Sequence, residues 1–507
     1  MFSNKFPIFL VATLLLFTAC DPLKKVQPSN NNSQSQSGEL DEIEGTKVYN
    51  PETGKYETKT DVTGEMEEVE WTDGSATEAP PIGSDATDRI GFPAPGNNPD
   101  TPPGTNPANE EDPFDTDFER NELPSYNMVL ALPFLANQNS TFDSEINEKS
   151  IFALNFYEGA KMAFEVLANE NVNLEVNVLD TRAAESETRG LTYNSAVQDA
   201  HVIIGTFKNS TAKIMAEYAL NNKKPFVSPY YPHNALVENN PYFVQLNPSI
   251  FTHCNALIRF LKRKYTDDQI VLIGRETRRD RGIINLYQKA HYTYAGSTSI
   301  EPLKEVIITD NNSTLENTEL KEHFMKDKPT VFVIASSQES FVYAILRKID
   351  IEKKNFDEED EDVILESDEL VVFGQPRWKD FTKISYDYYE KLNLHITSDN
   401  HIDPNAEIIR AFKQNFYAKY GSIPTEEAYK GFDTVLYFGR MLNQYGTEFL
   451  SIIDQVPHQG LQSNFNINRT VTKTRPLDDA NLNSFDQMEN THVHILAFKD
   501  YQFMVAQ

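Results

Sequence analysis

The feature that most constrains this chain is an alternation of short apolar runs with amphipathic stretches, which starts at Tyr126. The apolar runs are short and almost continuous, whereas apolar residues in the longer stretches recur at helical spacing. The expected strands are 128–135, 174–179, 201–205, 225–228, 242–246, 269–273, 305–308, 330–335 and 370–373, and the expected helices are 155–170, 211–221, 250–265, 282–290 and 341–349. This alternation predicts parallel sheets covered on both faces. The strands are too many for one sheet, so we expect an α/β fold with two doubly wound lobes.

Charge and cysteine content narrow the classes of function. The chain has 507 residues and a formal net charge of −30. A surface this acidic repels phosphate backbones, which argues against nucleic-acid binding. The two cysteines, Cys20 and Cys254, cannot supply a disulfide framework or a C-x-x-C zinc site. Cys254 falls in an expected helix, and we predict that its thiol is buried and inert.

Residues 1–19 have the pattern of an export signal. Lys5 precedes the apolar run 6–17, which is too short to span a membrane. Small residues then lead directly to Cys20, which resembles the lipobox of bacterial lipoproteins. The resemblance implies that residues 1–19 are a lipoprotein signal peptide and that Cys20 becomes the lipid anchor, holding the chain on a bacterial membrane, with the outer membrane favoured, facing the periplasm. The alternative is an ordinary signal peptide with an incidental cysteine.

The segment 20–123 differs in composition from the rest of the chain. Residues 21–124 contain 24 acidic and 7 basic residues, which places a net charge of −17 there, together with 13 of the 27 prolines. Apolar residues follow neither the strand nor the helix period, so the segment buries too little surface to offset its ordering entropy. We expect a disordered acidic tether. The alternative is an acidic interaction tail, with a site for calcium or a cationic partner around residues 65–70.

Five segments occur in an order that resembles a known family. They are 156–164, 202–211, 224–229, 269–274 and 429–437. Together they resemble the type I periplasmic binding proteins, and among these the branched-chain amino-acid-binding branch. The resemblance implies two lobes joined by a hinge of three crossovers, with the first lobe formed by 124–248 and 402–448 and the second by 249–401 and 449–507. It also implies that ligand binds in a cleft at the carboxyl ends of the strands.

The first candidate contact is the turn 205–211, in which a glycine leads from a strand into a helix. Backbone N–H groups at a helix start, together with the small side chains of Asn209, Ser210 and Thr211, suit an anionic group. The resemblance implies that this loop holds the ligand carboxylate. N-capping by Asn209 or Ser210 is the alternative, and the two roles are compatible.

Aromatic and basic residues occupy two further turns. Tyr230 and Tyr231 stand where the family has small residues, so they either stack on a ring or sugar at the rim of the cleft or fill the cavity. Arg275 opens a stretch with four arginines in seven residues, and guanidinium groups suit carboxylate or phosphate. The alternative is a solvated turn in which the arginines pair with Glu276 and Asp280.

The last candidate contacts follow two expected strands of the second lobe. Ser337 and Gln338 come after the strand 330–335, and Gln375 and Arg377 come after the next. The family often places an acidic residue near the second of these turns to meet the ligand ammonium, and Gln375 and Arg377 stand there instead. The ligand is therefore expected to be anionic or polar and neutral rather than a zwitterion.

Signatures of chemistry are missing from the sequence. No G-x-S-x-G, Walker loop, G-x-G-x-x-G or H-E-x-x-H occurs, so we expect neither an enzyme nor a cofactor. His492 and His494 share one face of a strand, but without a third ligand nearby we interpret them as structural rather than as a metal site.

The resulting hypothesis is an exported lipoprotein with a solute-binding module. The module captures a small polar or anionic ligand, with amino-acid-like molecules included, closes about its hinge and presents the closed form to an ABC transporter or a sensor. The alternative is a ligand-free scaffold that regulates a peptidoglycan synthase in the cell envelope, because the outer-membrane lipoproteins that activate these synthases have a carboxy-terminal domain of similar fold.

Overall fold

The computed structural model describes residues 47–50, 55–58, 122–139, 146–230, 240–309, 315–359, 369–470 and 487–506. The expected signal peptide, Cys20 and Tyr231 lie outside the described residues. Within the expected tether, β1 (Lys47–Asn50) and β2 (Lys55–Thr58) pair as an antiparallel hairpin, which the sequence analysis did not predict. This hairpin belongs to a unit that is separate from the rest of the chain.

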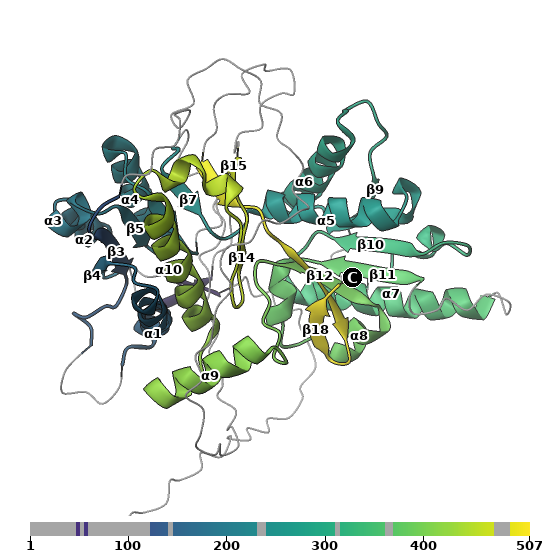
Figure 1. Cartoon of the computed structure of the whole chain (residues 1–507). Coiled ribbons are helices and arrows are strands. Elements are labelled where there is room, and N and C mark those ends of the chain that lie inside the picture. The colour runs from purple at the N-terminus through teal and green to yellow at the C-terminus, as the bar shows by residue number, and fades with distance from the viewer. Residues whose placement is uncertain are drawn as a thin grey trace, which may run out of the picture. The chain divides into compact units, whose positions relative to one another are not determined.

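The first lobe is built on a seven-stranded sheet with the order β15-β16-β7-β6-β5-β3-β4 (Figure 1). Its strands are β3 (Tyr126–Leu132), β4 (Leu174–Asp180), β5 (Val202–Gly205), β6 (Phe226–Ser228), β7 (Phe243–Gln245), β15 (Ile467–Thr470) and β16 (Gln487–Asn490). Its helices are α1 (Glu148–Asn169), α2 (Glu185–Leu191), α3 (Ser195–Gln198), α4 (Asn209–Asn222), α9 (Glu407–Tyr420) and α10 (Glu426–Tyr445). All neighbouring strands are parallel except β15 and β16.

After α10, the 3-10 turns η4 (Phe449–Ser451) and η5 (Ile453–Gln455) lead to a small hairpin of β13 (His458–Gln459) and β14 (Asn464–Phe465). The second lobe has its own seven-stranded sheet, with the order β18-β17-β12-β11-β10-β8-β9. Its strands are β8 (Ile270–Arg275), β9 (Lys304–Ile308), β10 (Thr330–Ile334), β11 (Leu370–Gly374), β12 (Leu394–Ser398), β17 (His494–Lys499) and β18 (Gln502–Val505). Its helices are α5 (Ile250–Lys264), η1 (Asp267–Gln269), α6 (Arg278–Ala295), η2 (Lys321–His323), α7 (Glu339–Glu359), η3 (Pro376–Asp380) and α8 (Tyr386–Lys391). Only β17 and β18 run antiparallel to their neighbours.

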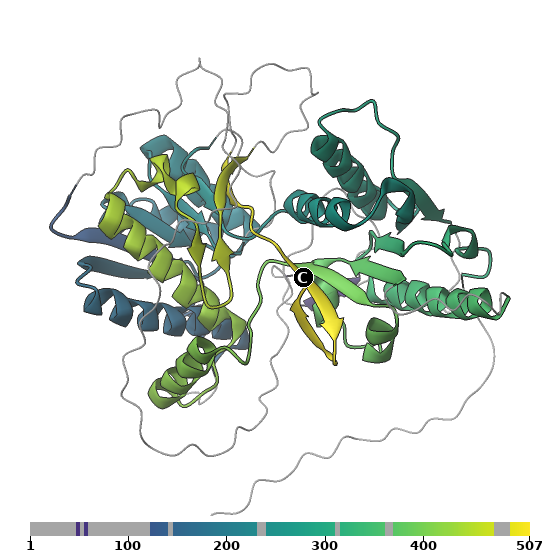
Figure 2. The ribbon, with the colours of Figure 1, turned by 45° about the vertical axis from the view of Figure 1, so that its right-hand side comes forward.

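Both faces of each sheet are covered, as the near-continuous apolar strands predict. In the first lobe, α1, α9 and α10 pack on one face and α3 and α4 on the other. In the second lobe, α7 and α8 cover one face and α5 and α6 the other, an arrangement that can be followed in Figure 2. The predicted α/β fold with two doubly wound, mostly parallel sheets is confirmed.

The chain passes between the two sheets after β7, after β12 and after β16, which gives the three crossovers that the resemblance implies. One predicted boundary is wrong. The sequence analysis places 449–507 in the second lobe, but β15 and β16 join the first sheet, and Phe449 and Phe465 pack in the first core. Only β17 and β18 join the second sheet. Because β15 and β16 are short and rich in polar residues, they lack the apolar pattern that marks the other strands.

The packing of α1 against α10 explains two of the family-like segments. Figures 1 and 2 show α10 lying alongside α1. Gly159 of α1 meets the backbone of Ala428, and Gly431 of α10 meets the backbone of Phe156, so closely that a Cβ atom on either glycine would overlap the opposite carbonyl oxygen. Glycine at both positions lets the two helices approach backbone to backbone.

Gly159→Ala or Gly431→Ala should therefore lower the free energy of unfolding by about 3 kcal/mol, because the added methyl group forces two packed helices apart. Gly282→Ala is the matched control, since Gly282 is an exposed glycine of α6 with open space around its Cα. This control should raise stability by about 0.5–1 kcal/mol. Urea denaturation measures all three variants, and equal stabilities for Gly159→Ala and Gly282→Ala would contradict the backbone-to-backbone packing.

Candidate functional site

The turn after β5 requires glycine. Gly205 has a φ of +135°. A Cβ atom at this position would also overlap the carbonyl oxygen of Ala131 on the neighbouring strand β3. Both constraints exclude a side chain at position 205. Glycine meets them and lets the chain bend directly from the sheet edge toward α4.

The start of α4 lies where the sequence predicts an anion-binding turn. Asn209, Ser210 and Thr211 are the first three helical residues, and Lys208 is the N-cap without a side-chain capping bond. Capping by Asn209 or Ser210 is therefore wrong, because both lie inside the helix. Thr211 Oγ1 donates to the Lys208 carbonyl oxygen at 2.9 Å. Among the described residues, no side chain caps the first N–H groups of α4, which carry the positive end of the helix dipole.

Two buried hydroxyl groups lie at the same edge of the sheet. Thr206 directly follows β5, and Ser228 ends the neighbouring strand β6. Both side chains are 0% exposed, and neither hydroxyl has a hydrogen-bond partner among the described residues. A buried hydroxyl without a partner costs about 1–3 kcal/mol, so this arrangement is one that a bound polar group would stabilise. Both residues lie in family-like segments, Thr206 in 202–211 and Ser228 in 224–229, but neither is among the predicted contacts.

An aromatic cluster occupies the neighbouring space. The Tyr230 side chain is buried, and its ring centroid lies 4.6 Å from that of Phe207. Phe207 in turn lies 5.2 Å from Phe152 and 5.5 Å from Phe156, both on α1. Of the two alternatives for Tyr230, filling the cavity is the one that the geometry favours.

Lys430 of α10 connects this cluster to the hinge, and the sequence analysis missed it. Its ammonium lies 4.6 Å from the centroid of the Tyr230 ring. It donates to Asn247 Oδ1, just after β7, at 2.6 Å and to Asp399 Oδ2, just after β12, at 3.2 Å. Asn247 and Asp399 flank two of the three crossovers. The only sequence signal for Lys430 was its place in the family-like segment 429–437.

A second lysine extends the charge network around Asp399. Lys379 of η3 donates to Asn400 Oδ1 at 3.1 Å and pairs with Glu426 of α10 at 3.4 Å. Burial alone would raise the pKa of the Asp399 carboxyl, but Lys430 and Lys379 outweigh it and hold that pKa well below its usual range. Asp399 is therefore ionised at neutral pH, and the network holds alternating charges from both lobes.

In the second lobe, the Arg275 guanidinium is engaged by neighbouring side chains. Its Nε and Nη2 reach the two carboxylate oxygens of buried Asp280 at 2.7 and 3.1 Å. It also donates to Gln338 and to Ser336 Oγ, and it lies 4.9 Å from the centre of the Phe341 ring. Arg275 thus pairs locally, as the alternative predicts, and contact with a ligand stays a prediction. The helix α6 begins at residue 278 rather than 282, so the later arginines lie in its first turn.

The other predicted contacts of the second lobe differ in their burial. The Gln375 side chain is buried, and its Nε2 donates to the Tyr287 hydroxyl at 2.9 Å. Arg377 is exposed on η3, and Ser337 is half-buried. The structure therefore brings Arg275 and Gln338 together but turns Gln375 into the core.

Three histidines meet at the hinge. The His494 ring lies 4.6 Å from that of His492 and 6.0 Å from that of His401, which the sequence analysis did not consider. In the part of the chain that the structure describes, no group of three or more His, Cys, Asp or Glu side chains is arranged to hold a metal ion. Burial lowers the pKa of His494 to about 4, with His492 and His401 adding to the effect. Burial likewise lowers the pKa of His253 on α5 to about 4, although Asp399 opposes this shift.

These two histidines make stability depend on pH. Their folded pKa of about 4 lies below the ordinary value of 6.5, so the unfolded chain binds more protons between these pH values. The contribution of these histidines to the free energy of unfolding should therefore be fully present above pH 6.5 and should be lost as the pH drops toward 4. We expect a loss of about 2 kcal/mol per histidine between pH 7 and pH 5.

Urea denaturation at both pH values tests this expectation. His253→Gln and His494→Gln should each flatten the pH dependence. His323→Gln is the control, because Glu322 beside His323 partly offsets the lowering of its pKa by burial. An unchanged pH dependence in both hinge variants would show that other groups carry it.

The remaining predictions concern Cys254 and membrane spans. Cys254 is fully buried, as predicted, and burial raises the pKa of its thiol well above the usual value, which favours the protonated, unreactive form. Among the described helices, none combines the length and the apolar character that a membrane crossing needs.

Comparison with known proteins identifies the family. Residues 157–478 match the family model described as the receptor family ligand binding region. This match covers more than half of the chain, and the chain belongs to that family. Its fold is that of the type I periplasmic binding proteins. A search of curated proteins gives no match.

Solved structures of binding proteins share this fold. A protein described as a branched-chain amino acid ABC transporter from Rhodospirillum rubrum is 13% identical, with a TM-score of 0.50 over 75% of this chain and 99% of that chain. An ABC transporter substrate-binding protein from Desulfitobacterium hafniense in complex with Leu is 15% identical, with a TM-score of 0.44 over 75% of this chain and 100% of that chain. A leucine-binding protein from Thermotoga maritima is 16% identical, with a TM-score of 0.41 over 75% and 98%. The chain is thus a module that resembles solute-binding proteins at low identity.

Proposed function

We propose that this module captures a small anionic or polar ligand at the carboxyl ends of the first-lobe strands. The observation that carries the proposal is the start of α4, which no described side chain caps, beside the buried hydroxyls of Thr206 and Ser228, which have no hydrogen-bond partner among the described residues. Backbone N–H groups and the helix dipole favour negative charge, and each hydroxyl can donate one hydrogen bond. A carboxylate or a similar group would satisfy these donors, for which the described part of the chain supplies no partner.

The ligand differs from the leucine of the relatives in at least one respect. The cluster around Tyr230 and Phe207 fills space beside the site, and Lys430 adds a positive charge there. Lys430 donates two of its three N–H groups to Asn247 and Asp399, and the third can donate to a negative or polar group but not to the ammonium of a free amino acid. Dicarboxylates are therefore the first class of compound to test.

The surroundings of the chain form part of the proposal. A lipid at Cys20 and an acidic tether would hold the module at the surface of a bacterial envelope membrane, with the outer membrane favoured. There the module would present its ligand-bound form to a transporter or a sensor. The sequence pattern before Cys20 and the charge of the tether support this placement.

A ligand-free scaffold that regulates a peptidoglycan synthase is the second candidate. The observation that favours it is the engagement of the predicted contacts within the protein. Arg275 pairs with Asp280, Gln375 bonds to Tyr287, and Tyr230 packs among phenylalanines. Side chains that already have partners within the protein need no small ligand.

The variants Thr206→Val and Ser228→Ala should distinguish capture of a small ligand from a scaffold that binds none. Each change removes a partnerless hydroxyl, so stability without ligand should stay equal or rise by up to about 1 kcal/mol. In thermal melts of the wild type with dicarboxylates, amino acids, nucleosides and muropeptides, a receptor should gain about 5 °C with at least one compound. Both variants should lose most of that shift.

Thr434→Val is the matched control, because Thr434 also carries a buried hydroxyl without a partner among the described residues, but on α10. This control should keep the full shift. If no compound shifts the wild type and a wall synthase is captured by the purified chain, the scaffold is favoured. If the shift survives in Thr206→Val and Ser228→Ala alike, the ligand binds elsewhere.

Cys20→Ser should release the exported chain from the membrane fraction, because a serine hydroxyl cannot replace the thiol that the lipid would modify. Cell fractionation with immunoblotting measures the distribution. Cys254→Ser is the control, since this buried thiol should have no part in anchoring. Membrane retention of Cys20→Ser would exclude lipidation as the anchor.

A further inference from the structure

The first lobe carries a cavity at the edge opposite the proposed ligand site. Its volume is about 490 Å³, and its lining residues come from the ends of α2, α3 and α4 and from the segments that precede β5 and β6. They are Thr192, Tyr193, Gln198, Tyr218, Asn222 and Lys224. The 14-residue helix α4 runs from the proposed ligand site to this cavity, a distance of about 20 Å. The two places are therefore separate sites on one rigid element.

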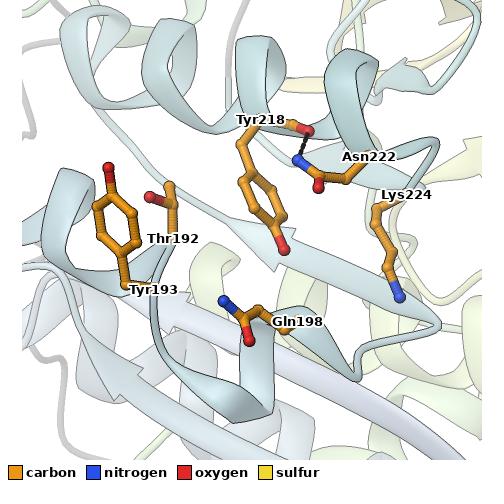
Figure 3. Close-up of a pocket in the computed structure, with 6 residues that line it drawn as sticks. All are labelled: Thr192, Tyr193, Gln198, Tyr218, Asn222 and Lys224. Carbon is orange, nitrogen blue, oxygen red and sulfur yellow. Dashed lines mark hydrogen bonds between the residues drawn. The ribbon is translucent and has the colours of Figure 1, made fainter.

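The lining combines aromatic rings with short polar groups. The Tyr193 side chain is 82% exposed, so its ring is accessible to a molecule that enters the cavity. Figure 3 shows the hydroxyl of Tyr218 pointing toward the side chain of Gln198, with Lys224 on one side and Tyr193 and Thr192 on the other. Asn222 Nδ2 donates to the Tyr218 carbonyl oxygen at 2.9 Å, which orients its amide.

Charge at this cavity is nearly balanced. Lys224 donates to the carbonyl oxygen of Ala200 at 3.0 Å, and this bond uses one of the three N–H groups of its ammonium. Burial lowers the pKa of Lys224, and nearby Asp199 opposes the shift. Burial and Asp199 both raise the pKa of Tyr218, so its hydroxyl stays protonated and able to donate. A strongly anionic ligand gains little from one lysine beside an aspartate.

We propose that this cavity binds a short oligosaccharide, neutral or with a single carboxylate. A sugar ring has an apolar C–H face that covers a tyrosine ring, and its edge carries hydroxyl groups that both donate and accept. Side-chain amides, hydroxyls and an ammonium match those groups in number and kind. Among the described residues that line the cavity there is no Val, Leu, Ile or Met side chain, so a lipid or an aliphatic peptide would bury little apolar surface there. The depression is shallow and open, and its volume leaves room for one or two sugar rings.

Direct titration of the full-length chain tests this site. The probes are the disaccharide of N-acetylglucosamine, cellobiose and glucuronic acid, followed by saturation-transfer NMR. Because the cavity is shallow and exposed, the expected Kd for the best probe is about 1 mM. Tyr193→Ala should weaken that binding at least about fivefold, whereas Tyr193→Phe, which keeps the ring, should retain most of it.

Two controls keep the result specific to this cavity. Tyr294→Ala removes another exposed tyrosine, 50% exposed on α6 of the second lobe, and should leave sugar binding unchanged. Thr206→Val should also leave it unchanged, so that failure of the proposed ligand site and failure of the sugar site can be told apart. The sugar site is excluded if no probe saturates, or if Tyr193→Ala binds as the wild type does. Equal losses in Tyr193→Ala and Tyr294→Ala would likewise exclude it, because they would mean unspecific stacking on exposed rings.

Discussion

The arrangement of the hinge depends on the ammonium group of Lys430. This one charge on α10 contacts the Tyr230 ring, the Asn247 amide after β7 and the Asp399 carboxylate after β12. The ends of two strands from different sheets therefore converge on a single, largely buried cation. A buried charge persists only where it is paired, and loss of one partner of such a pair costs about 3–5 kcal/mol. Lys379 supplies a second cation to Asp399, so the crossovers meet at an electrostatic junction rather than at an apolar one.

The sheets could be predicted because their central strands are buried on both faces. A strand such as β5 is apolar at nearly every position and has no other stable location than the middle of an α/β domain. The same reasoning misses β15 and β16, whose polar sequences pair at the sheet edge. It also misses Asp433, whose carboxylate accepts the backbone N–H groups of residues 461–463 at 2.7–3.0 Å. These bonds fold the segment after α10 back onto the first lobe, and they join residues about thirty positions apart, which no local pattern reveals.

The backbone of the candidate site could be predicted from the sequence, but the contacts of its side chains could not. The turn after β5 and the start of α4 lie where Gly205 and the small residues predict, because these are local properties of the chain. The Arg275 guanidinium binds Asp280. The sequence alone does not show whether such a guanidinium binds a neighbouring carboxylate or a ligand. His401 and His494 come into contact because two crossovers lie together, so the sequence around either histidine does not predict the contact.

The two ends of α4 differ in a way that assigns different ligands to them. At its carboxyl end, Lys223 has a left-handed conformation, and the backbone N–H groups of Lys223 and Lys224 bond to the carbonyl oxygens of Leu220 and Ala219. This cap satisfies two of the last four carbonyls of α4, so it reduces what the negative end of the dipole can offer to a cation. At the amino end no side chain caps the helix among the described residues. Recognition by charge therefore belongs to the amino end. Recognition at the carboxyl end must come from side chains, and the rings and amides found there suit a sugar.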